Sequence, residues 1–96
     1  MSDWYLYIIK CRDDSLYTGI TLDVDRRFRD HASQGSRCAK YLKGRSPLRL
    51  VFVERIGDKR VAHRVEKCVK QLNKSKKLAL IRGTLRLNDV ILNAYP

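Results

Sequence analysis

Two short apolar runs stand close together near the N-terminus, and a brief polar stretch separates them. The first run covers 4–11 and the second 16–21, and both are rich in aromatic and β-branched residues without helical spacing. The sequence between them, Arg-Asp-Asp-Ser, consists of residues that favour a tight turn. A link this short joins antiparallel strands, so the pattern predicts a β-hairpin.

Helical spacing begins soon after the second run. Asp23 is a good N-cap, and apolar residues then recur at four-residue steps until a glycine is reached. On a helical wheel, Val24, Phe28 and Ala32 form one stripe that would face a core. The pattern therefore predicts a first helix over 24–34.

The second half of the chain predicts one more strand and two more helices. Apolar residues alternate over 48–56, which is typical of a strand. They then recur at helical steps and predict a helix over 59–73. Ser75 is a candidate N-cap for a short third helix that Gly83 would end.

This order of elements indicates an α+β fold, with a small three-stranded antiparallel sheet flanked by helices. A chain of 96 residues is long enough to build one hydrophobic core but not two. We expect one domain over 1–83. The C-terminal tail, 84–96, carries enough Leu, Ile and Val to pack against the same domain.

Charge is the second strong constraint. Lys and Arg number 21 against 10 Asp and Glu, which gives a net charge of +11 and points to a polyanionic partner. No apolar run approaches the roughly 18–20 residues of a spanning helix and no signal peptide opens the chain, so we expect a cytoplasmic protein without a membrane partner. Cys11, Cys38 and Cys68 are widely spaced without a Cys-x-x-Cys pair, and we assign no chemistry to them.

Four residues in the first half of the chain could meet on one small surface. Tyr7 and Tyr17 are ten residues apart, Arg27 follows after ten more, and His31 lies four residues further along the same predicted helix. A phenol can accept a proton and a guanidinium can hold a phosphate oxygen, so the set suits phosphodiester hydrolysis. Taken singly, each residue has a simpler structural interpretation, because strand tyrosines usually pack at the rim of a sheet.

Glu66 is the one acidic residue of the second predicted helix. It lies at the edge of the apolar stripe, where a carboxylate can point into a cleft. Lys70 follows one turn later, and an ion pair between the two would be worth only about 0.2–0.5 kcal/mol. From the residues alone we favour that ion pair.

In combination these residues resemble a known nuclease domain. The Tyr-Leu-Tyr motif at 5–7, the Tyr-Thr-Gly motif at 17–19, Arg27 and Glu66 are similar in order and spacing to the GIY-YIG nuclease superfamily, over about residues 3–75. The loop sequence AKYLKGRSPL resembles that of its small single-domain members of the UPF0213 kind. The resemblance implies a GIY-YIG-like fold and endonuclease activity.

Carried over residue by residue, the resemblance implies catalytic roles for Tyr7, Tyr17, Arg27, His31 and Glu66. Glu66 would also bind the divalent metal ion, Mg²⁺ or Mn²⁺. Arg27 would hold phosphate oxygens, and one of the two phenols would be the general base while the other positions the reactants. The sequence does not decide between the phenols. Tyr5 replaces the glycine of the family's first motif, and the asparagine that some members place about three turns after the glutamate has no clear counterpart.

Basic residues are the candidate contacts to nucleic acid. A basic loop covers 36–47, with one turn around Tyr41, and a second group of lysines follows Glu66. We predict contacts to nucleic acid from Gly19, Lys40, Lys43, Arg45 and Lys70. Because acids are sparse in both groups, phosphate binding is a better interpretation than a solvated face. We therefore expect a monomeric endonuclease that acts on DNA with low sequence preference, in repair or recombination, with a partner protein for targeting.

Two other classes of function stay open. One is a module that binds DNA or structured RNA and cleaves it weakly or not at all, which the missing asparagine favours. The other is a small basic protein associated with RNA or the ribosome, for which charge and size alone are sufficient. Cleavage of DNA in the presence of a divalent metal ion would separate the nuclease from both.

Overall fold

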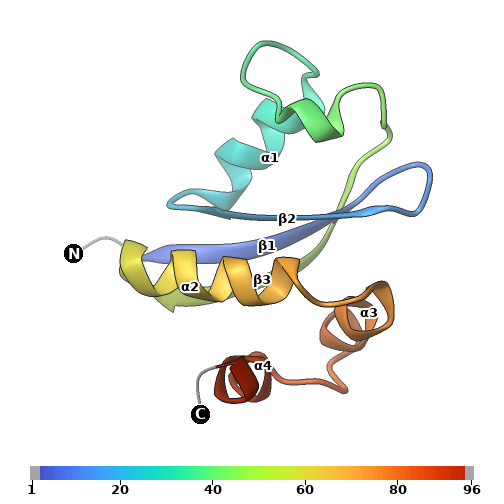
Figure 1. Cartoon of the computed structure of the whole chain (residues 1–96). Coiled ribbons are helices and arrows are strands. Elements are labelled where there is room, and N and C mark those ends of the chain that lie inside the picture. The colour runs from blue at the N-terminus through green and yellow to red at the C-terminus, as the bar shows by residue number, and fades with distance from the viewer. Residues whose placement is uncertain (1–2, 95–96) are drawn as a thin grey trace.

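A three-stranded antiparallel sheet lies between helices on both of its faces (Figure 1). The computed structural model describes residues 3–94 of the chain. Residues 1–2 of the predicted domain and residues 95–96 of the predicted tail lie outside the described part. β1 (Trp4–Lys10) is the central strand, flanked by β2 (Leu16–Thr21) and β3 (Arg49–Gly57). The predicted α+β class and three-stranded sheet are confirmed, with strand ends displaced by one residue.

The first two strands form the predicted hairpin. Asp13 stabilises the turn, because its carboxylate accepts hydrogen bonds from the backbone N–H and the hydroxyl of Ser15, at 3.1 and 2.6 Å. In the ladder, Tyr7 stands opposite Gly19 and Ile9 opposite Tyr17. Paired residues direct their side chains to the same face, so both phenols and the glycine share one face of the sheet.

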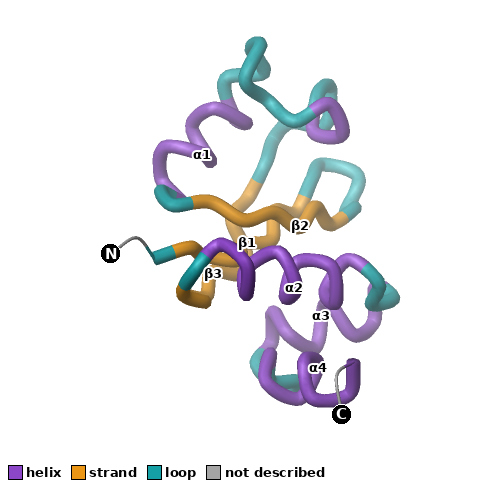
Figure 2. Tube along the Cα trace, turned by 60° about the vertical axis from the view of Figure 1, so that its left-hand side comes forward, coloured by secondary structure: helices purple, strands orange, loops and turns teal. Residues whose placement is uncertain are grey.

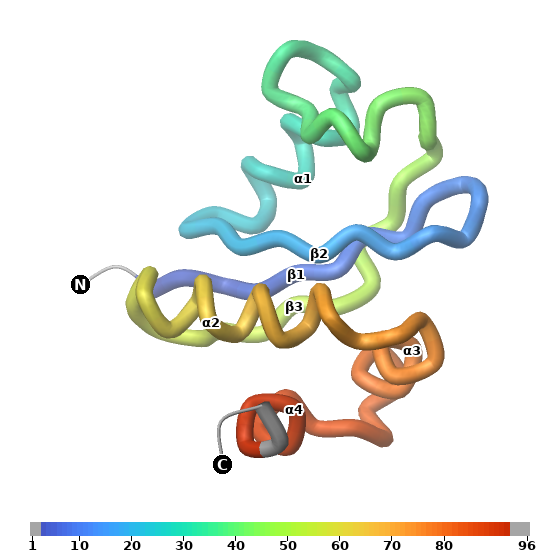
Figure 3. Tube along the Cα trace, in the orientation of Figure 1, coloured from blue at the N-terminus to red at the C-terminus, as the bar shows by residue number. Residues whose placement is uncertain are grey.

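That face is covered by α1 (Val24–Ala32) and the loop that follows it, which contains the short 3₁₀ helix η1 (Lys40–Leu42) (Figure 3). Asp23 is the N-cap as predicted, accepting a hydrogen bond from the backbone N–H of Arg26. The helix ends two residues before the predicted boundary at 34. Gln34 has left the helix with a φ of 58°, and its side chain instead binds the loop.

The buried side of α1 also differs from the prediction. Ala32 was expected in the buried stripe but is exposed, whereas His31 is completely buried. The last turn of the helix faces the two tyrosines rather than an apolar surface, and an imidazole can both fill that space and hydrogen bond there. The helical wheel therefore predicted the buried side of the helix correctly at Val24 and Phe28 but not in the last turn.

The opposite face of the sheet carries α2 (Lys59–Lys70), α3 (Lys74–Arg82) and α4 (Leu87–Ala94), which forms most of the C-terminal tail. Figure 2 shows α3 and α4 beyond α2, on the side away from α1. The buried residues of this core are Leu6, Ile8, Val65, Cys68, Val69, Leu80, Leu87 and Val90. Apart from the thiol, these side chains are aliphatic, so burial of apolar surface holds the layer together.

Two helix boundaries on this face differ from the prediction. The second helix ends at Lys70 rather than at 73, and Asn73 is the N-cap of α3 in place of Ser75. The Asn73 side chain accepts a hydrogen bond of 2.9 Å from the backbone N–H of Lys76, and asparagine caps a helix at least as well as serine. Gly83 ends α3 as predicted, with a φ of 82°. Over residues 3–94, no helix has the length and apolar character needed to cross a bilayer.

Candidate active site

Tyr7 and Gly19 form the centre of the site. The Tyr7 side chain is only 2% exposed and its ring lies directly over Gly19 on the neighbouring strand. A Cβ atom at Gly19 would stand 2.4 Å from the Tyr7 hydroxyl oxygen, so only glycine fits. Because β2 is an edge strand, the missing side chain lets the phenol reach across it toward the rim of the sheet.

His31 holds the Tyr7 phenol through a buried hydrogen bond. The His31 Nε2 atom lies 2.9 Å from the Tyr7 hydroxyl oxygen, and Nδ1 accepts a hydrogen bond of 3.2 Å from the backbone N–H of Ala39. A nitrogen that accepts carries no proton, so the neutral imidazole has its proton on Nε2 and donates to Tyr7. The tyrosine oxygen is therefore an acceptor, and its own proton is available to another group.

Burial controls the ionisation of this pair. It lowers the pKa of His31 from 6.5 to about 4, with a smaller contribution from the Arg27 charge that Asp30 opposes. Burial also raises the pKa of Tyr7 well above its ordinary value, and Tyr17 and Glu66 act in the same direction while Arg27 opposes them. At neutral pH both groups are uncharged in the free protein.

Tyr17 lies beside this pair and is less buried. Its ring centroid is 6.3 Å from that of Tyr7 and 5.6 Å from that of His31, the latter in an edge-on arrangement. On its other side it stacks on Tyr41 at 5.9 Å. The second phenol is thus half-buried in an aromatic cluster, with more access to solvent than Tyr7 has.

Arg27 approaches the phenols from α1. Its guanidinium donates a hydrogen bond of 2.6 Å to the backbone carbonyl of Arg37 and forms an ion pair of 3.8 Å with Asp30. These contacts fix the side chain between helix and loop, and its charge favours ionisation of Tyr7. Arg27 is one third exposed, so the guanidinium has solvent access for an anion.

Glu66 reaches the same place from the other face of the sheet. It lies on α2, which packs against β1 and β2, and its carboxylate makes an ion pair with Lys70 at 3.5 Å. The His63 Nδ1 atom lies 3.8 Å from the other carboxylate oxygen. The ion pair expected from the sequence is therefore present. The Glu66 charge also raises the pKa of Tyr7, as the smallest of the contributions to that shift. The structure thus brings Tyr7, Tyr17 and His31 into direct contact, whereas Arg27 and Glu66 act on the ionisation of Tyr7 from opposite faces of the sheet.

Comparison with known proteins supports the same assignment. The sequence model described as the GIY-YIG catalytic domain matches residues 3–79. The chain belongs to the GIY-YIG family. It is 47% identical over 81 residues to the UPF0213 protein YhbQ of Salmonella typhimurium, covering 84% of this chain and 79% of that protein. A UPF0213 protein of Cronobacter sakazakii is 47% identical over 85 residues, covering 88% and 87%.

A solved structure agrees in fold. The solution NMR structure of a UPF0213 protein from Bacillus halodurans has a TM-score of 0.53, with 46% sequence identity and 83% of each chain covered. It has the α+β architecture found here. The fold predicted from the GIY-YIG resemblance is therefore confirmed. The GIY-YIG domain is characteristic of nucleases.

The fit of a divalent metal ion to this GIY-YIG site rests on Glu66. Within the described part of the chain, no group of three or more His, Cys, Asp or Glu could form a metal cage. Mg²⁺ does not need one, since it commonly binds one or two carboxylates together with waters and substrate phosphate. Lys70 lies 3.5 Å from the Glu66 carboxylate, so a metal ion would take the position that the lysine charge now has.

The predicted nucleic-acid contacts occupy three different places. Gly19 and Lys70 lie at the rim, whereas Lys40 and Lys43 are exposed on the loop. Arg45 is fixed: it pairs with Asp13, donates 2.7 Å to the Tyr41 carbonyl and lies 4.4 Å over the Tyr41 ring. Its charge is already matched by a carboxylate.

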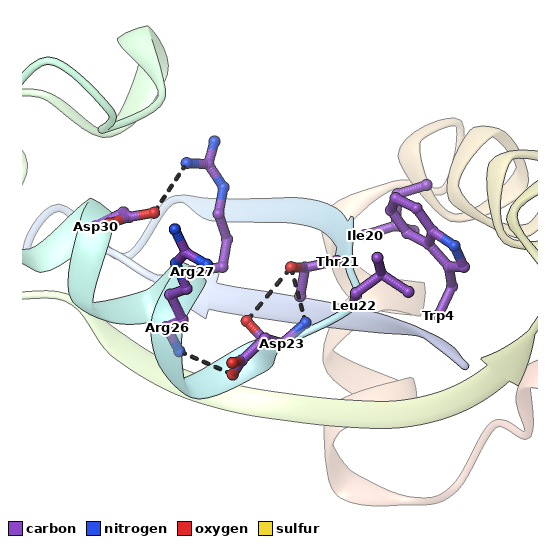
Figure 4. Close-up of a pocket in the computed structure, with 8 residues that line it drawn as sticks. All are labelled: Trp4, Ile20, Thr21, Leu22, Asp23, Arg26, Arg27 and Asp30. Carbon is purple, nitrogen blue, oxygen red and sulfur yellow. Dashed lines mark hydrogen bonds and ion pairs between the residues drawn. The ribbon is translucent and has the colours of Figure 1, made fainter. Parts of the chain in front are cut away.

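Shallow recesses lie on both sides of Gly19 along the edge of β2. One, of about 360 Å³, is drawn in Figure 4, where Trp4 and Ile20 lie on one side and Arg26, Arg27 and Asp30 on the other. The second, also about 360 Å³, is lined by Leu16, Tyr17, Thr18, Tyr41, Lys70 and Lys77. The two recesses leave room for an extended polymer strand along the edge of β2, across the GIY-YIG site.

One basic residue of this rim was not among the predicted contacts. Lys77 is half-buried at the second recess, although its neighbours Lys74 and Lys76 are exposed. Lys77 stands three residues before the buried Leu80 and Lys76 stands four before it, and both spacings place a residue on the same helix face. Helical spacing therefore does not distinguish the two lysines, and the packing of α3 decides which one faces the body of the protein.

Proposed function

We propose that this GIY-YIG protein is a divalent-metal-dependent endonuclease that hydrolyses DNA phosphodiester bonds with little sequence preference. The observation that carries the proposal is the position of the Tyr7 phenol, which His31 holds over Gly19 at the edge of the sheet with Tyr17 beside it. Arg27 from one layer and Glu66 from the other both influence the ionisation of this phenol. A proton acceptor, a phosphate-binding cation and a metal-binding carboxylate at one rim are the groups that this hydrolysis needs.

In this proposal Tyr7 first releases its own proton to solvent, and the resulting phenolate accepts the proton of the attacking water. The hydrogen bond from His31 Nε2–H and the charge of Arg27 both favour the phenolate. Burial opposes ionisation, which keeps the phenol protonated until further positive charge is present. Tyr17 is more accessible and is proposed to orient the water beside it.

Arg27 is proposed to hold the nonbridging oxygens of the scissile phosphate. A guanidinium is planar and permanently charged, so it stabilises the negative charge that grows in the transition state. Glu66 would hold the metal ion, which when bound supplies positive charge for the phosphate and the leaving oxygen. Lys70 would then be released from its ion pair and become free for another anion.

Low sequence preference follows from the shape of the site. The recesses beside Gly19 are shallow and lined by basic and aromatic side chains. Reading a base sequence usually needs an element inserted into a groove of the duplex, whereas contacts to phosphates only position the DNA. The net charge of +11 adds a strong attraction that is independent of sequence.

The test is incubation of the purified protein with supercoiled plasmid, branched DNA and structured RNA, each with Mg²⁺, with Mn²⁺ or with EDTA. We expect nicking of DNA that requires the metal and falls by about 10³-fold in Glu66→Gln and in Arg27→Ala, as for loss of a main transition-state contact. Matched controls are Glu54→Gln and Arg29→Ala, which change exposed residues of the same type and should retain activity.

Three results would contradict the proposal. One is nicking that survives both Glu66→Gln and Arg27→Ala, because the activity would then come from another site or from a contaminant. Another is salt-sensitive DNA binding without any cut, which would identify a binding module. Cleavage restricted to RNA would place the protein in a different substrate class.

A further inference from the structure

The recess next to Tyr17 has the features of an anion site. Lys70 and Lys77 both line it, and no acidic side chain does. Burial lowers the pKa of Lys77, and the nearby charge of Lys70 lowers it further. Two lysines thus line one recess, of which Lys77 is half-buried with no ion-pair partner among residues 3–94, while Lys70 is paired with Glu66. The arrangement is unfavourable for the Lys77 charge in the protein alone.

An unsatisfied donor lies under the same recess. Thr18 lines it, is only 3% exposed, and is the one residue in the described part of the chain whose buried side-chain oxygen or nitrogen lacks a hydrogen-bond partner. Buried hydroxyls without a partner are rare in folded proteins. A phosphate in the recess would bring negative charge toward the lysines, and it would reach the enclosed Thr18 hydroxyl after a small shift of the side chains over it.

The charged side of the recess determines what it can recognise. The Tyr41 ring centroid lies 5.9 Å from that of Tyr17 and 4.4 Å from the Arg45 guanidinium, which is paired with Asp13. Two ammonium groups attract a phosphate whichever base it carries. The recess therefore suits the backbone of a nucleic acid.

The recess adjoins the candidate active site, because two of its residues belong to both. Tyr17 belongs both to the recess and to the aromatic cluster with Tyr7 and His31. Lys70 belongs both to the recess and to the ion pair of Glu66. A DNA strand with its scissile phosphate beside Glu66 would therefore place a neighbouring phosphate at Lys70 and Lys77.

We propose that the recess formed by Lys70, Lys77, Tyr17 and Thr18 is a subsite for the DNA phosphate adjacent to the scissile one. This rests on the proposed function for the identity of the scissile phosphate. The subsite fixes the position of the strand along the edge of β2 without reading its sequence. Lys77 is its specific contact, because Lys70 also serves Glu66.

The test is a scan of single phosphates measured by binding. The full chain is kept in EDTA to prevent cleavage, and its affinity is measured by fluorescence anisotropy for a labelled branched DNA whose cut position has been mapped. One uncharged methylphosphonate at a time replaces a phosphate around the cut. The proteins compared are the unsubstituted chain, Lys77→Gln, and the control Lys76→Gln, which removes the same charge from an exposed neighbour.

We expect the unsubstituted protein and Lys76→Gln to lose about tenfold in affinity when the phosphate next to the cut is neutralised, as for a charge-assisted hydrogen bond. Lys77→Gln should bind unmodified DNA about tenfold more weakly and then be insensitive to that same replacement. Equal sensitivity of Lys77→Gln and the unsubstituted protein at every position would overturn the subsite.

The two proposals can fail separately. A protein that cuts DNA but shows no coupling between Lys77 and any phosphate lacks the subsite and retains the nuclease function. A protein that never cuts but shows the coupling at a single phosphate has the subsite without the function, and the DNA position is then taken from the binding scan.

Thermal unfolding provides an independent readout. If the lysine pair is an unfavourable arrangement kept for binding, Lys77→Gln should raise the Tm by a few degrees while it weakens DNA binding, since it removes a partly buried charge beside Lys70. Lys76→Gln should leave the Tm nearly unchanged. A fall in Tm for Lys77→Gln would show that this lysine stabilises the fold and would count against the subsite.

Discussion

The two faces of the sheet are held in place by different forces. The α2 face is an aliphatic core, to which α2, α3 and α4 all contribute buried residues. The α1 face buries Tyr7 and His31 in a polar contact, and Gln34 ties α1 to the loop by binding Leu42 and Gly44. The α1 face has an apolar cluster as well, built on Ile9 and Leu42, so the chain has two clusters rather than the single core expected from its length. Burial of apolar area stabilises both layers, and the second adds specific hydrogen bonds.

The α1 face is also less completely covered. Leu50 and Val53 on β3 stand opposite Ile9 and Tyr7 on that face and remain 37% and 44% exposed. The α2 layer has the larger apolar cluster, and the α1 layer provides a place where pKa values are shifted and side chains are fixed near solvent. A small protein can thus keep groups with shifted pKa values on one face of the sheet while the other face is covered by an apolar core.

The strongest test of this division is truncation of the aliphatic layer. Leu80→Ala should lower the free energy of unfolding by about 2–5 kcal/mol, because the side chain is 2% exposed and its loss leaves a cavity. Leu92→Ala, at a position 64% exposed, should change it by less than about 0.5 kcal/mol. Urea titration measures both. Similar losses in the two variants would argue against a dominant aliphatic core.

The polar layer should make stability depend on pH. The pKa of His31 is about 4 in the fold against 6.5 as the ordinary value, so the unfolded chain binds the proton first. Stability should be highest above pH 6.5 and fall by up to about 3 kcal/mol as the pH drops toward 4.

Urea titrations at several pH values measure this dependence. The control is His63→Gln, since His63 is largely exposed and the dependence should survive its loss. His31→Gln should remove most of it. If the pH dependence of the free energy of unfolding disappears in His63→Gln instead, the α2 layer is its source and the prediction is wrong.

Close contact between the strands can be tested at Gly19. Gly19→Ala should lower the free energy of unfolding by about 1–3 kcal/mol, because the added Cβ meets the Tyr7 phenol and the ring has to move. Cleavage should fall with it. Gly35→Ala is the control, since its Cβ would meet only the Ser33 hydroxyl at 3.4 Å. Full activity in Gly19→Ala would mean that the position of the phenol is unimportant.

The smallest expected effect concerns the start of α3. Asn73→Ala should lower the free energy of unfolding by about 1 kcal/mol through loss of the N-cap, whereas Ser75→Ala should have almost no effect. Thermal unfolding followed by circular dichroism compares the two variants. A larger loss of stability in Ser75→Ala than in Asn73→Ala would show that Ser75 is the N-cap, as the sequence predicted.

Local patterns predicted most of the fold. The hairpin, the Asp23 cap and the Gly83 stop depend on neighbouring residues, so they can be recognised in one dimension. Boundaries were missed where a competing residue lay nearby, as with Asn73 beside Ser75. The burial of His31 was missed because helical periodicity describes apolar residues and does not identify a polar one that satisfies its hydrogen bonds internally.

The candidate site was predicted as a set of residues and not as a geometry. The resemblance selected Tyr7, Arg27 and Glu66, but Arg27 and Glu66 lie in layers on opposite faces of the sheet. The sequence did not indicate that Lys77 lies at the same rim as Lys70, since both are members of a lysine-rich stretch. Which lysine faces the body depends on how α3 packs.

By itself the sequence determined the α+β architecture, the family and the strong positive charge, because turn chemistry, residue periodicity and charge are properties of the chain. Only the tertiary structure decided that the phenol passes over Gly19 at an edge strand, where the charge of a carboxylate from the far layer acts on it. The physical reason is that such a meeting depends on packing between elements distant in sequence, and on the absence of one side chain at the strand that separates them.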